Sequence, residues 1–179
     1  QFRSWNLYRS KLAAAILKNL NFEIKPNYDV LYLGAATGTT VSHISDIIKN
    51  GIIFAVENSA IAIKDLIKVS EKRKNIIPIL EDANHPDRYN SIVCTVDIIY
   101  QDISQRNQSE IFIKNAKRYL KKDGQGLLMV KARSIDVSLK PKEVFKIVSD
   151  ELEGNDFKVK NVIELSPYEK DHAAILVSL

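Results

Sequence analysis

Asp29-Val-Leu-Tyr-Leu-Gly-Ala-Ala-Thr-Gly-Thr-Thr40 is the stretch of sequence that indicates the fold most directly. Its first half is a short run of apolar, β-branched and aromatic residues that stops at a glycine, which is typical of a buried strand. Its second half has a second glycine followed by two threonines, residues that favour a tight turn and a helix start. The stretch therefore predicts a strand, a glycine turn and a helix in succession.

The same alternation continues along the rest of the chain. Further strands are predicted at 52–56, 76–80, 96–101, 126–132, 157–165 and 172–178, and helices at 8–20, 39–49, 60–73, 108–120 and 141–153. Apolar strands separated by helices are typical of an α/β, doubly wound, Rossmann-like fold, here with a seven-stranded and mostly parallel sheet. Only residues 166–171 separate the last two strands. Because so short a segment cannot form a crossover helix, we expect a C-terminal antiparallel hairpin.

Length and composition restrict the class of protein. The chain has 179 residues with 26 basic and 22 acidic side chains, one Cys and a hydrophobic content of 45%. These values exclude a disordered, collagen-like or disulfide-stapled protein and predict a single domain over residues 1–179. No segment resembles a signal peptide or a membrane span, so we expect a cytoplasmic protein without a membrane partner. Cys94 lies in the apolar run SIVCTV and is predicted to be buried and unreactive.

Acidic residues follow several of the predicted strands, at the edge where doubly wound sheets bind ligands. Glu57 follows the second strand, Glu81 and Asp82 follow the third, and Asp102 follows the fourth. A carboxylate after the second strand commonly accepts hydrogen bonds from ribose hydroxyls. The glycine turn does not have the G-x-G-x-x-G spacing of a pyrophosphate site. Together these features indicate a nucleoside without phosphates, and S-adenosylmethionine fits that description, although each acid alone is typical of a helix cap or a solvated loop.

Three further polar residues are candidates for chemistry. Lys131 ends an apolar strand, where a buried cation needs a partner, and Asp102 on the neighbouring strand is the expected one. Lys11 interrupts the apolar pattern of the first helix, and His172 opens the last strand. A structural ion pair for Lys131, a solvated Lys11 and a structural His172 are the alternatives that remain open for each residue taken alone.

Five segments in order resemble the fibrillarin family: SKLAAAI (10–16), VLYLGAATGTTVSHISDI (30–47), AVE (55–57), EDA (81–83) and YEKDHA (168–173). This resemblance implies the fold of S-adenosylmethionine-dependent methyltransferases and the activity of an RNA 2′-O-methyltransferase that acts on rRNA and tRNA in box C/D guide-RNA particles. It also implies four partners, which are the guide RNA, the target RNA, a coiled-coil scaffold protein and a kink-turn-binding protein. The family commonly has a β-rich N-terminal lobe, which we expect to be absent here.

The resemblance also implies roles for individual residues. The implied cofactor-binding residues are Gly34, Ala35, Thr39, Thr40, Glu57, Asn58, Asp82, Ala83, Asp102, Ile103, Ser104 and Gln105. The implied catalytic group is Lys11, Asp102, Lys131 and His172, and no metal site is expected. In this hypothesis Lys131, held by Asp102, orients the 2′-hydroxyl or accepts its proton, while Lys11 stabilises the developing alkoxide and His172 orients the network.

Two positions depart from the family pattern. Asn58 stands where the family commonly has an aromatic residue, and Gln101 stands where it has a small one. These departures leave room for a scaffold subunit without catalysis. A stand-alone methyltransferase of the FtsJ kind is the other alternative, but that family has Glu where this chain has His172. Arg133, Lys140 and Lys142 are candidates for phosphate contacts, although a solvated face explains them equally well.

Overall fold

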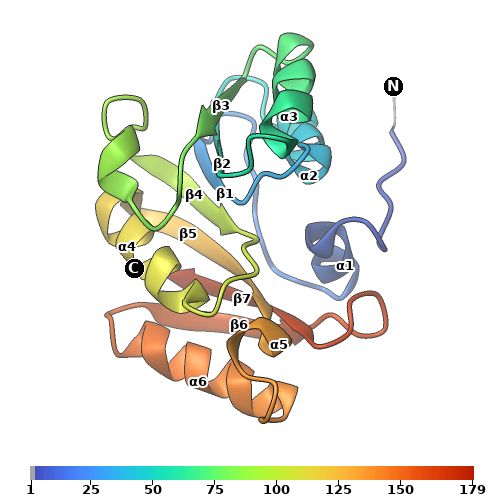
Figure 1. The fold of residues 1–179 in the computed structure, drawn as a ribbon, viewed down its shortest axis with the longest axis vertical. Helices are drawn as coiled ribbons and strands as arrows, with labels where there is room; N and C mark the ends of the chain where they lie inside the picture. Colours follow the sequence, from blue (N-terminus) through green and yellow to red (C-terminus); the bar gives the residue numbers. More distant parts are fainter. Residues whose placement is uncertain (1–2) are drawn as a thin grey trace.

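The computed structural model describes residues 3–179, which are arranged around one twisted seven-stranded sheet (Figure 1). The strands are β1 (Val30–Leu33), β2 (Ile53–Glu57), β3 (Ile76–Leu80), β4 (Val96–Gln101), β5 (Leu120–Lys131), β6 (Lys158–Glu164) and β7 (His172–Ser178). They are ordered β3-β2-β1-β4-β5-β7-β6. The first five are parallel, and β7 pairs antiparallel with both β5 and β6. The predicted fold class, strand number and C-terminal hairpin are therefore confirmed.

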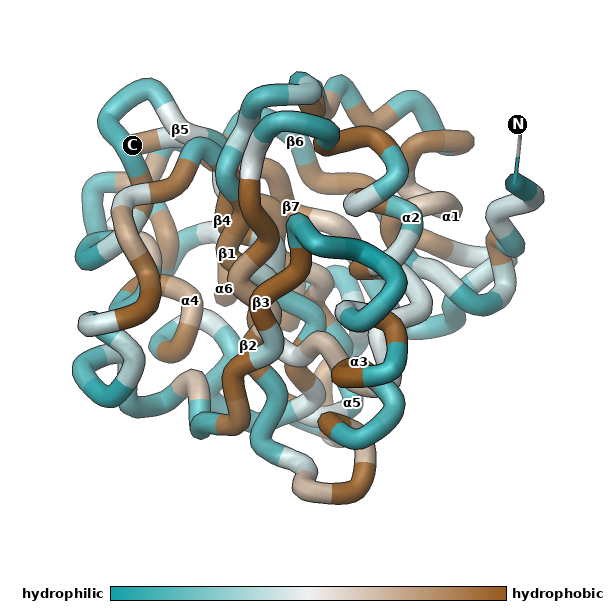
Figure 2. Tube along the Cα trace, turned by 90° about the horizontal axis from the view of Figure 1, so that it is seen from above, coloured by the Kyte–Doolittle hydropathy of each residue, from teal (hydrophilic) through white to brown (hydrophobic). Residues whose placement is uncertain are grey.

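Helices cover both faces of the sheet. The core on one face includes side chains of α1 (Lys11–Leu17), α2 (Thr39–Ile47) and α3 (Ala62–Glu71). The core on the other face includes side chains of α4 (Gln108–Tyr119) and α6 (Pro141–Glu153). Figure 2 shows the hydrophobic strands near the centre of the molecule and hydrophilic connections at its periphery. Apolar side chains alternate between the two cores along each strand, as a sheet buried on both faces requires.

Several local features differ from the sequence-based expectation, and one is that β5 begins at Leu120 rather than at 126. The first helix begins at Lys11 and ends at Leu17, so it is shorter than the predicted 8–20. Its start is fixed by Ser10, whose hydroxyl accepts a hydrogen bond from the Ala13 N–H. Its end is fixed because Asn19 adopts the left-handed region, with φ of 64°. Two short helices, a 3₁₀ turn η1 (Pro86–Tyr89) and α5 (Ala132–Ile135), were not predicted.

Cys94 is exposed, so the prediction that it is buried is wrong. The strand begins only at Val96, and Cys94 therefore lies in the loop that precedes it. In that loop Val93 occupies the buried position, at 5% exposure. An apolar run does not bury each of its residues once the backbone leaves the regular strand.

Candidate active site

Gly34 brings the carboxyl ends of β1 and β4 together. Its φ of 82° lies in the left-handed region that side chains rarely adopt. A Cβ atom at this position would lie 2.4 Å from the carbonyl oxygen of Asp102. The N–H of Asp102 in turn donates to the carbonyl of Leu33 at 2.9 Å. The glycine is therefore required for the close approach that places Asp102 beside the turn.

A cavity of about 280 Å³ opens at this edge of the sheet, a size just below the range of typical small-molecule pockets. It contains nine of the twelve predicted cofactor-binding residues: Gly34, Glu57, Asn58, Asp82, Ala83, Asp102, Ile103, Ser104 and Gln105. The sequence did not single out Ala36 and Val56, which also line the cavity, and Glu81 was noted only as a strand-end acid. Ala36 has a φ of 47°, a backbone state that the sequence pattern does not reveal.

The carboxylate of Glu57 is held rigidly at the cavity wall. Its side chain is buried at 8% exposure, and Oε2 accepts a hydrogen bond from the Ala36 N–H at 2.7 Å. Oε1 accepts a second one from the Ser59 N–H at 2.8 Å. Each carboxylate oxygen has two acceptor sites, so both keep capacity for ligand hydroxyls. This arrangement suits a ribose diol better than a phosphate, which the carboxylate would repel.

Asp82 provides a second fixed negative charge in the cavity. The backbone N–H and the side-chain amide of Asn84 both donate to its Oδ1 at 2.9 Å. These two hydrogen bonds, the backbone one first, hold the pKa of Asp82 below its ordinary value. The Asn84 amide also donates to the Gln105 side-chain oxygen at 3.0 Å. The loops after β3 and β4 are thus joined around the cavity.

The remaining three predicted cofactor residues, Ala35, Thr39 and Thr40, are not among the residues that line the cavity. Ala35 is buried at 4% exposure, and Thr39 is exposed at the start of α2. Thr40 is buried, and its hydroxyl donates to the Ser10 hydroxyl at 3.1 Å. Because Ser10 caps α1, this hydrogen bond connects the glycine turn to the helix that carries Lys11.

The structure places the four predicted catalytic residues on one face of the sheet. Lys131 and His172 are direct cross-strand partners in the antiparallel pairing of β5 with β7, and such partners have neighbouring side chains on one face. Met129 and Ala174, two positions along from each, belong to the core that contains α1. Strand alternation therefore directs Lys131 and His172 toward the face that α1 covers.

Lys11 rather than Lys131 is the ion-pair partner of Asp102. The Nζ atom of Lys11 lies 2.9 Å from Oδ1 and 3.1 Å from Oδ2 of Asp102, and both side chains are largely buried. Within residues 3–179 no ion pair involves Lys131. The expected pairing of Lys131 with Asp102 is therefore wrong, as is a solvated Lys11. Lys11 reaches the carboxylate from a helix above the sheet, which strand order alone could not predict.

The ring of His172 has a defined tautomer when neutral. Its Nδ1 lies 2.7 Å from the carbonyl oxygen of Lys170, and a carbonyl can only accept. Nδ1 therefore carries the proton, and Nε2 has a free lone pair. The Glu169 carboxylate lies 4.0 Å from Nδ1. The histidine can thus accept a proton at Nε2.

Sequence reasoning missed Gln108, which fixes the backbone of Lys131. This side chain is fully buried at the start of α4. Its Oε1 accepts from the Lys131 N–H at 3.0 Å, and its Nε2 donates to the Lys131 carbonyl at 3.2 Å. Gln101, the unusual residue before Asp102, donates to the Gln108 carbonyl at 2.7 Å. The sequence shows only a glutamine at the start of the predicted helix 108–120, which does not by itself indicate this role.

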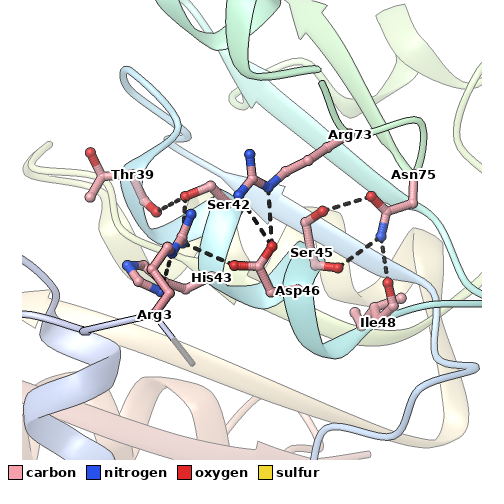
Figure 3. A network of polar contacts seen from close by, with 9 residues as sticks. All are labelled: Arg3, Thr39, Ser42, His43, Ser45, Asp46, Ile48, Arg73 and Asn75. Carbon is pink, nitrogen blue, oxygen red and sulfur yellow. Dashed lines mark hydrogen bonds and ion pairs between the residues drawn. The ribbon is translucent and has the colours of Figure 1, made fainter. Parts of the chain in front are cut away.

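The N-terminal segment is joined to α2 by a polar network (Figure 3). The guanidinium of Arg3 donates to Ser42 Oγ at 2.9 Å and to His43 Nδ1 at 3.3 Å, and it pairs with Asp46 at 3.3 Å. Arg73 from the end of α3 pairs with the same carboxylate at 3.2 Å. The ring of Trp5 stacks on that of His43 with centroids 4.6 Å apart. These contacts hold the chain that leads into α1.

Metal and membrane features are absent from the part of the chain that the structure describes. Among residues 3–179 no group of three or more His, Cys, Asp or Glu side chains is arranged to hold a metal ion. Across the same residues no helix combines the length and apolar character that a bilayer span needs.

Comparison with known proteins identifies the family. The sequence model described as fibrillarin matches residues 1–179, which is the whole chain. The chain belongs to the fibrillarin family. A fibrillarin-like rRNA/tRNA 2′-O-methyltransferase of Thermococcus sibiricus is 52% identical over 99% of this chain and 79% of its own length. One from Methanocaldococcus jannaschii is 50% identical over 96% of this chain and 75% of its own length.

Solved fibrillarin structures superimpose closely on this chain. Fibrillarin from a fibrillarin/Nop5p complex has 51% identity and a TM-score of 0.95, over 98% of this chain and 84% of that one. Aeropyrum pernix fibrillarin, solved with natively bound S-adenosyl-L-methionine, has 43% identity and a TM-score of 0.88, over 97% and 76% of the two chains. An Aquifex aeolicus S-adenosylmethionine-dependent methyltransferase, at 18% identity and a TM-score of 0.68, shares the fold alone.

Proposed function

We propose that this fibrillarin is an S-adenosylmethionine-dependent RNA 2′-O-methyltransferase and the catalytic subunit of a box C/D guide-RNA particle in the cytoplasm. The observation that carries the proposal is the placement of the Lys11–Asp102 pair, Lys131 and His172 on one face of the sheet, with Asp102 also lining the nucleoside-sized cavity. Fibrillarin-like relatives near 50% identity are named as rRNA/tRNA 2′-O-methyltransferases.

The cavity suits the nucleoside part of S-adenosylmethionine. Glu57 has acceptor capacity for the ribose hydroxyls, and Asp82 is placed to accept a hydrogen bond from an exocyclic amine. The backbone at Gly34 has no side chain, so the ligand can approach it closely. When bound, the cofactor supplies an electrophilic methyl group on a sulfonium, whose positive charge the acidic cavity favours. Asn58 offers a polar amide where family members commonly stack an aromatic ring.

The catalytic residues divide the remaining work. The 2′-oxygen of the target ribose forms a bond to the methyl carbon as the carbon–sulfur bond breaks, and the 2′-hydroxyl loses its proton. Lys131, which takes part in no ion pair among residues 3–179, orients the 2′-hydroxyl, and Nε2 of the adjacent His172 accepts its proton. Lys11, which pairs with Asp102, stabilises the developing negative charge on the oxygen. Positioning supplies much of the remaining rate.

A guide RNA and two proteins complete the proposed particle. The coiled-coil scaffold is supported by the fibrillarin/Nop5p complex, whose fibrillarin superimposes on 98% of this chain. The kink-turn-binding protein, the guide RNA and the target RNA follow from the family resemblance. Of the basic side chains considered for phosphate contacts, Arg133 pairs with Asp171 at 3.1 Å and Lys142 pairs with Glu164 at 3.4 Å. Lys140 is therefore the freest of the three to contact a phosphate.

The test is methyl transfer to a guide-matched RNA in a reconstituted particle, with the methylated nucleotide mapped. We expect wild type to methylate one 2′-hydroxyl, and Lys131→Ala to lose at least about 100-fold in rate with unchanged cofactor affinity. Lys122→Ala is the matched control, because Lys122 is exposed on the same strand β5 at its far end. Full-rate methylation of RNA without a guide would favour the stand-alone enzyme, and no methylation would favour the scaffold subunit. Normal turnover of the Lys131 variant would refute the catalytic assignment.

A further inference from the structure

Two tyrosines, Tyr8 exposed and Tyr168 half-buried, form an aromatic pair on the segments that carry two of the proposed catalytic residues. Tyr8 precedes Lys11 by three positions, and Tyr168 precedes His172 by four. Their rings meet edge to face with centroids 5.5 Å apart, although they are 160 positions apart in sequence. Tyr8 is 67% exposed, so its ring is accessible to a ligand. Neither side chain belongs to the cofactor cavity.

Local backbone contacts present both rings. The Asn6 side chain accepts from the Tyr8 N–H at 2.9 Å, and the Asn6 carbonyl accepts from the Arg9 N–H at 3.2 Å, which closes a tight turn before α1. In the β6–β7 connection, the Tyr168 N–H donates to the Leu165 carbonyl at 2.9 Å. Each ring is therefore carried by a hydrogen-bonded turn, which limits the entropy lost when a ligand binds.

The two segments that carry the rings are also joined to each other. Lys18, at the end of α1, donates from Nζ to the Ser166 carbonyl at 2.5 Å. The Leu165 N–H donates to the His172 carbonyl at 2.9 Å, so the loop with Tyr168 is anchored at the proposed active site. Figure 1 shows the β6–β7 connection lying beside α1 at the edge of the molecule.

The charge around the pair is suited to a polyanion. Arg9 follows Tyr8 directly and Lys170 lies two residues after Tyr168, and both are exposed. Within residues 3–179 neither takes part in an ion pair. The nearby carboxylates are already engaged, since Asp171 pairs with Arg133 and Glu169 lies near His172. Aromatic faces flanked by unpaired cations are the surface that RNA-binding proteins use for nucleotides.

We propose that Tyr8 and Tyr168 form a contact site for a nucleotide of the substrate RNA adjacent to the methylated one, with Arg9 and Lys170 contacting its phosphates. This inference rests on the proposed function and adds a substrate-positioning site to it. The apolar face of the nucleotide lies on the Tyr8 ring, and the edge contact with Tyr168 fixes the orientation of that ring. The site would hold the target strand while Lys11 and His172 meet the reactive ribose.

The experiment uses the reconstituted particle with Tyr8→Ala, Tyr8→Leu and Tyr8→Phe. We expect Tyr8→Ala and Tyr8→Leu to raise the KM for target RNA by roughly fivefold or more, with little change in kcat or in cofactor affinity. Tyr8→Phe keeps the ring and should behave as wild type, which separates the aromatic face from general apolar contact. Ile92→Ala is the control, because Ile92 is 49% exposed in the loop before β4, at the amino ends of the parallel strands.

Abasic nucleotides placed on either side of the target position distinguish the part of the nucleotide that is contacted. If Tyr8 stacks on a base, an abasic substitution at one position raises KM in wild type and adds nothing in Tyr8→Ala. If it packs on a sugar, the abasic RNAs behave normally while Tyr8→Ala still raises KM. An unchanged KM in Tyr8→Ala would overturn the proposal of a contact site, and so would a variant that binds RNA normally but fails to bind the scaffold protein. In either case methylation by wild type would still support the proposed function. No methylation by wild type would instead defeat the proposed function, and RNA affinity measured directly with the Tyr8 variants would still decide the contact site.

Discussion

Replacing Gly34 by Ala is the sharpest single test of how the backbone organises the site. The new Cβ would lie 2.4 Å from the Asp102 carbonyl oxygen, about 1 Å closer than ordinary contact. An L side chain in the left-handed region costs about 1–2 kcal/mol, and overpacking against a fixed backbone typically adds about 1–3 kcal/mol. We therefore expect Gly34→Ala to lower the free energy of unfolding by about 2–5 kcal/mol.

The assay combines thermal melting with activity. For a chain of this size the loss corresponds to a melting temperature lower by about 5–15 °C. Gly154→Ala is the matched control, because Gly154 has an ordinary helical φ of −65° and the closest atom to its added Cβ would be 3.3 Å away. That variant should stay within about 1 kcal/mol of wild type.

The functional readout of Gly34→Ala is more specific than its melting. Relief of the clash must push the β4 terminus away from β1, which moves Asp102 away from Lys11. Activity at a temperature where the variant is fully folded should therefore fall by at least about tenfold, as expected for losing a charge-assisted hydrogen bond of roughly 1.5–3 kcal/mol. A Gly34→Ala protein that melts and methylates like wild type would refute the reasoning about this contact.

Two further predictions follow from the same structure. Gln108→Leu removes both hydrogen bonds to the Lys131 backbone and should reduce kcat by about tenfold or more with little change in the KM for the cofactor. Gln108→Glu should also be impaired, because a carboxylate cannot donate to the Lys131 carbonyl. Normal activity of Gln108→Glu would contradict this prediction. Burial, and then the Arg3 guanidinium, lower the pKa of His43, so the folded state binds its proton less readily than the unfolded chain. The stability that this difference contributes is present above the pKa of the unfolded chain, near 6.5, and is lost as the pH falls through the pKa of the folded state. Melting temperatures recorded between about pH 7.5 and 5 should therefore fall more steeply in wild type than in His43→Gln. Parallel plots of melting temperature against pH for the two proteins would contradict the role of this ring.

The fold could be predicted from the sequence because the strands are buried on both faces. Residues 30–33 form an uninterrupted apolar and aromatic run, which predicts a strand buried on both faces, and all four residues are buried. The glycine turn indicated where the ligand-binding end of the sheet lies. Glycine tolerates a positive φ close to another strand, whereas residues with a side chain rarely do. The short connection at residues 166–171 allowed only a hairpin, which is the pairing observed.

The details of the site depended on contacts between distant parts of the chain. The pairing of Asp102 with Lys11 joins residues 91 positions apart through the docking of a helix on the sheet. Sequence order suggested Lys131 instead, because strand neighbours are visible in the pattern and helix placement is not. The role of Gln108 was hidden for a similar reason. From helix α4 its side chain forms hydrogen bonds with the backbone of strand β5, and side-chain chemistry alone does not reveal that.

The hydrogen bond between Thr40 and Ser10 helps to keep the helix that carries Lys11 docked on the sheet. Lys11 is carried by a helix of only seven residues, and such a helix does not persist in water by itself. It exists because Leu12 and Ala15 pack on the sheet and because Ser10 is tied to α2. Undocking of this one element would leave the sheet folded and the cofactor cavity formed, but would remove the cation that we propose stabilises the reacting oxygen. Any partner that clamps the helix in place would then act as an activator without touching the reacting atoms.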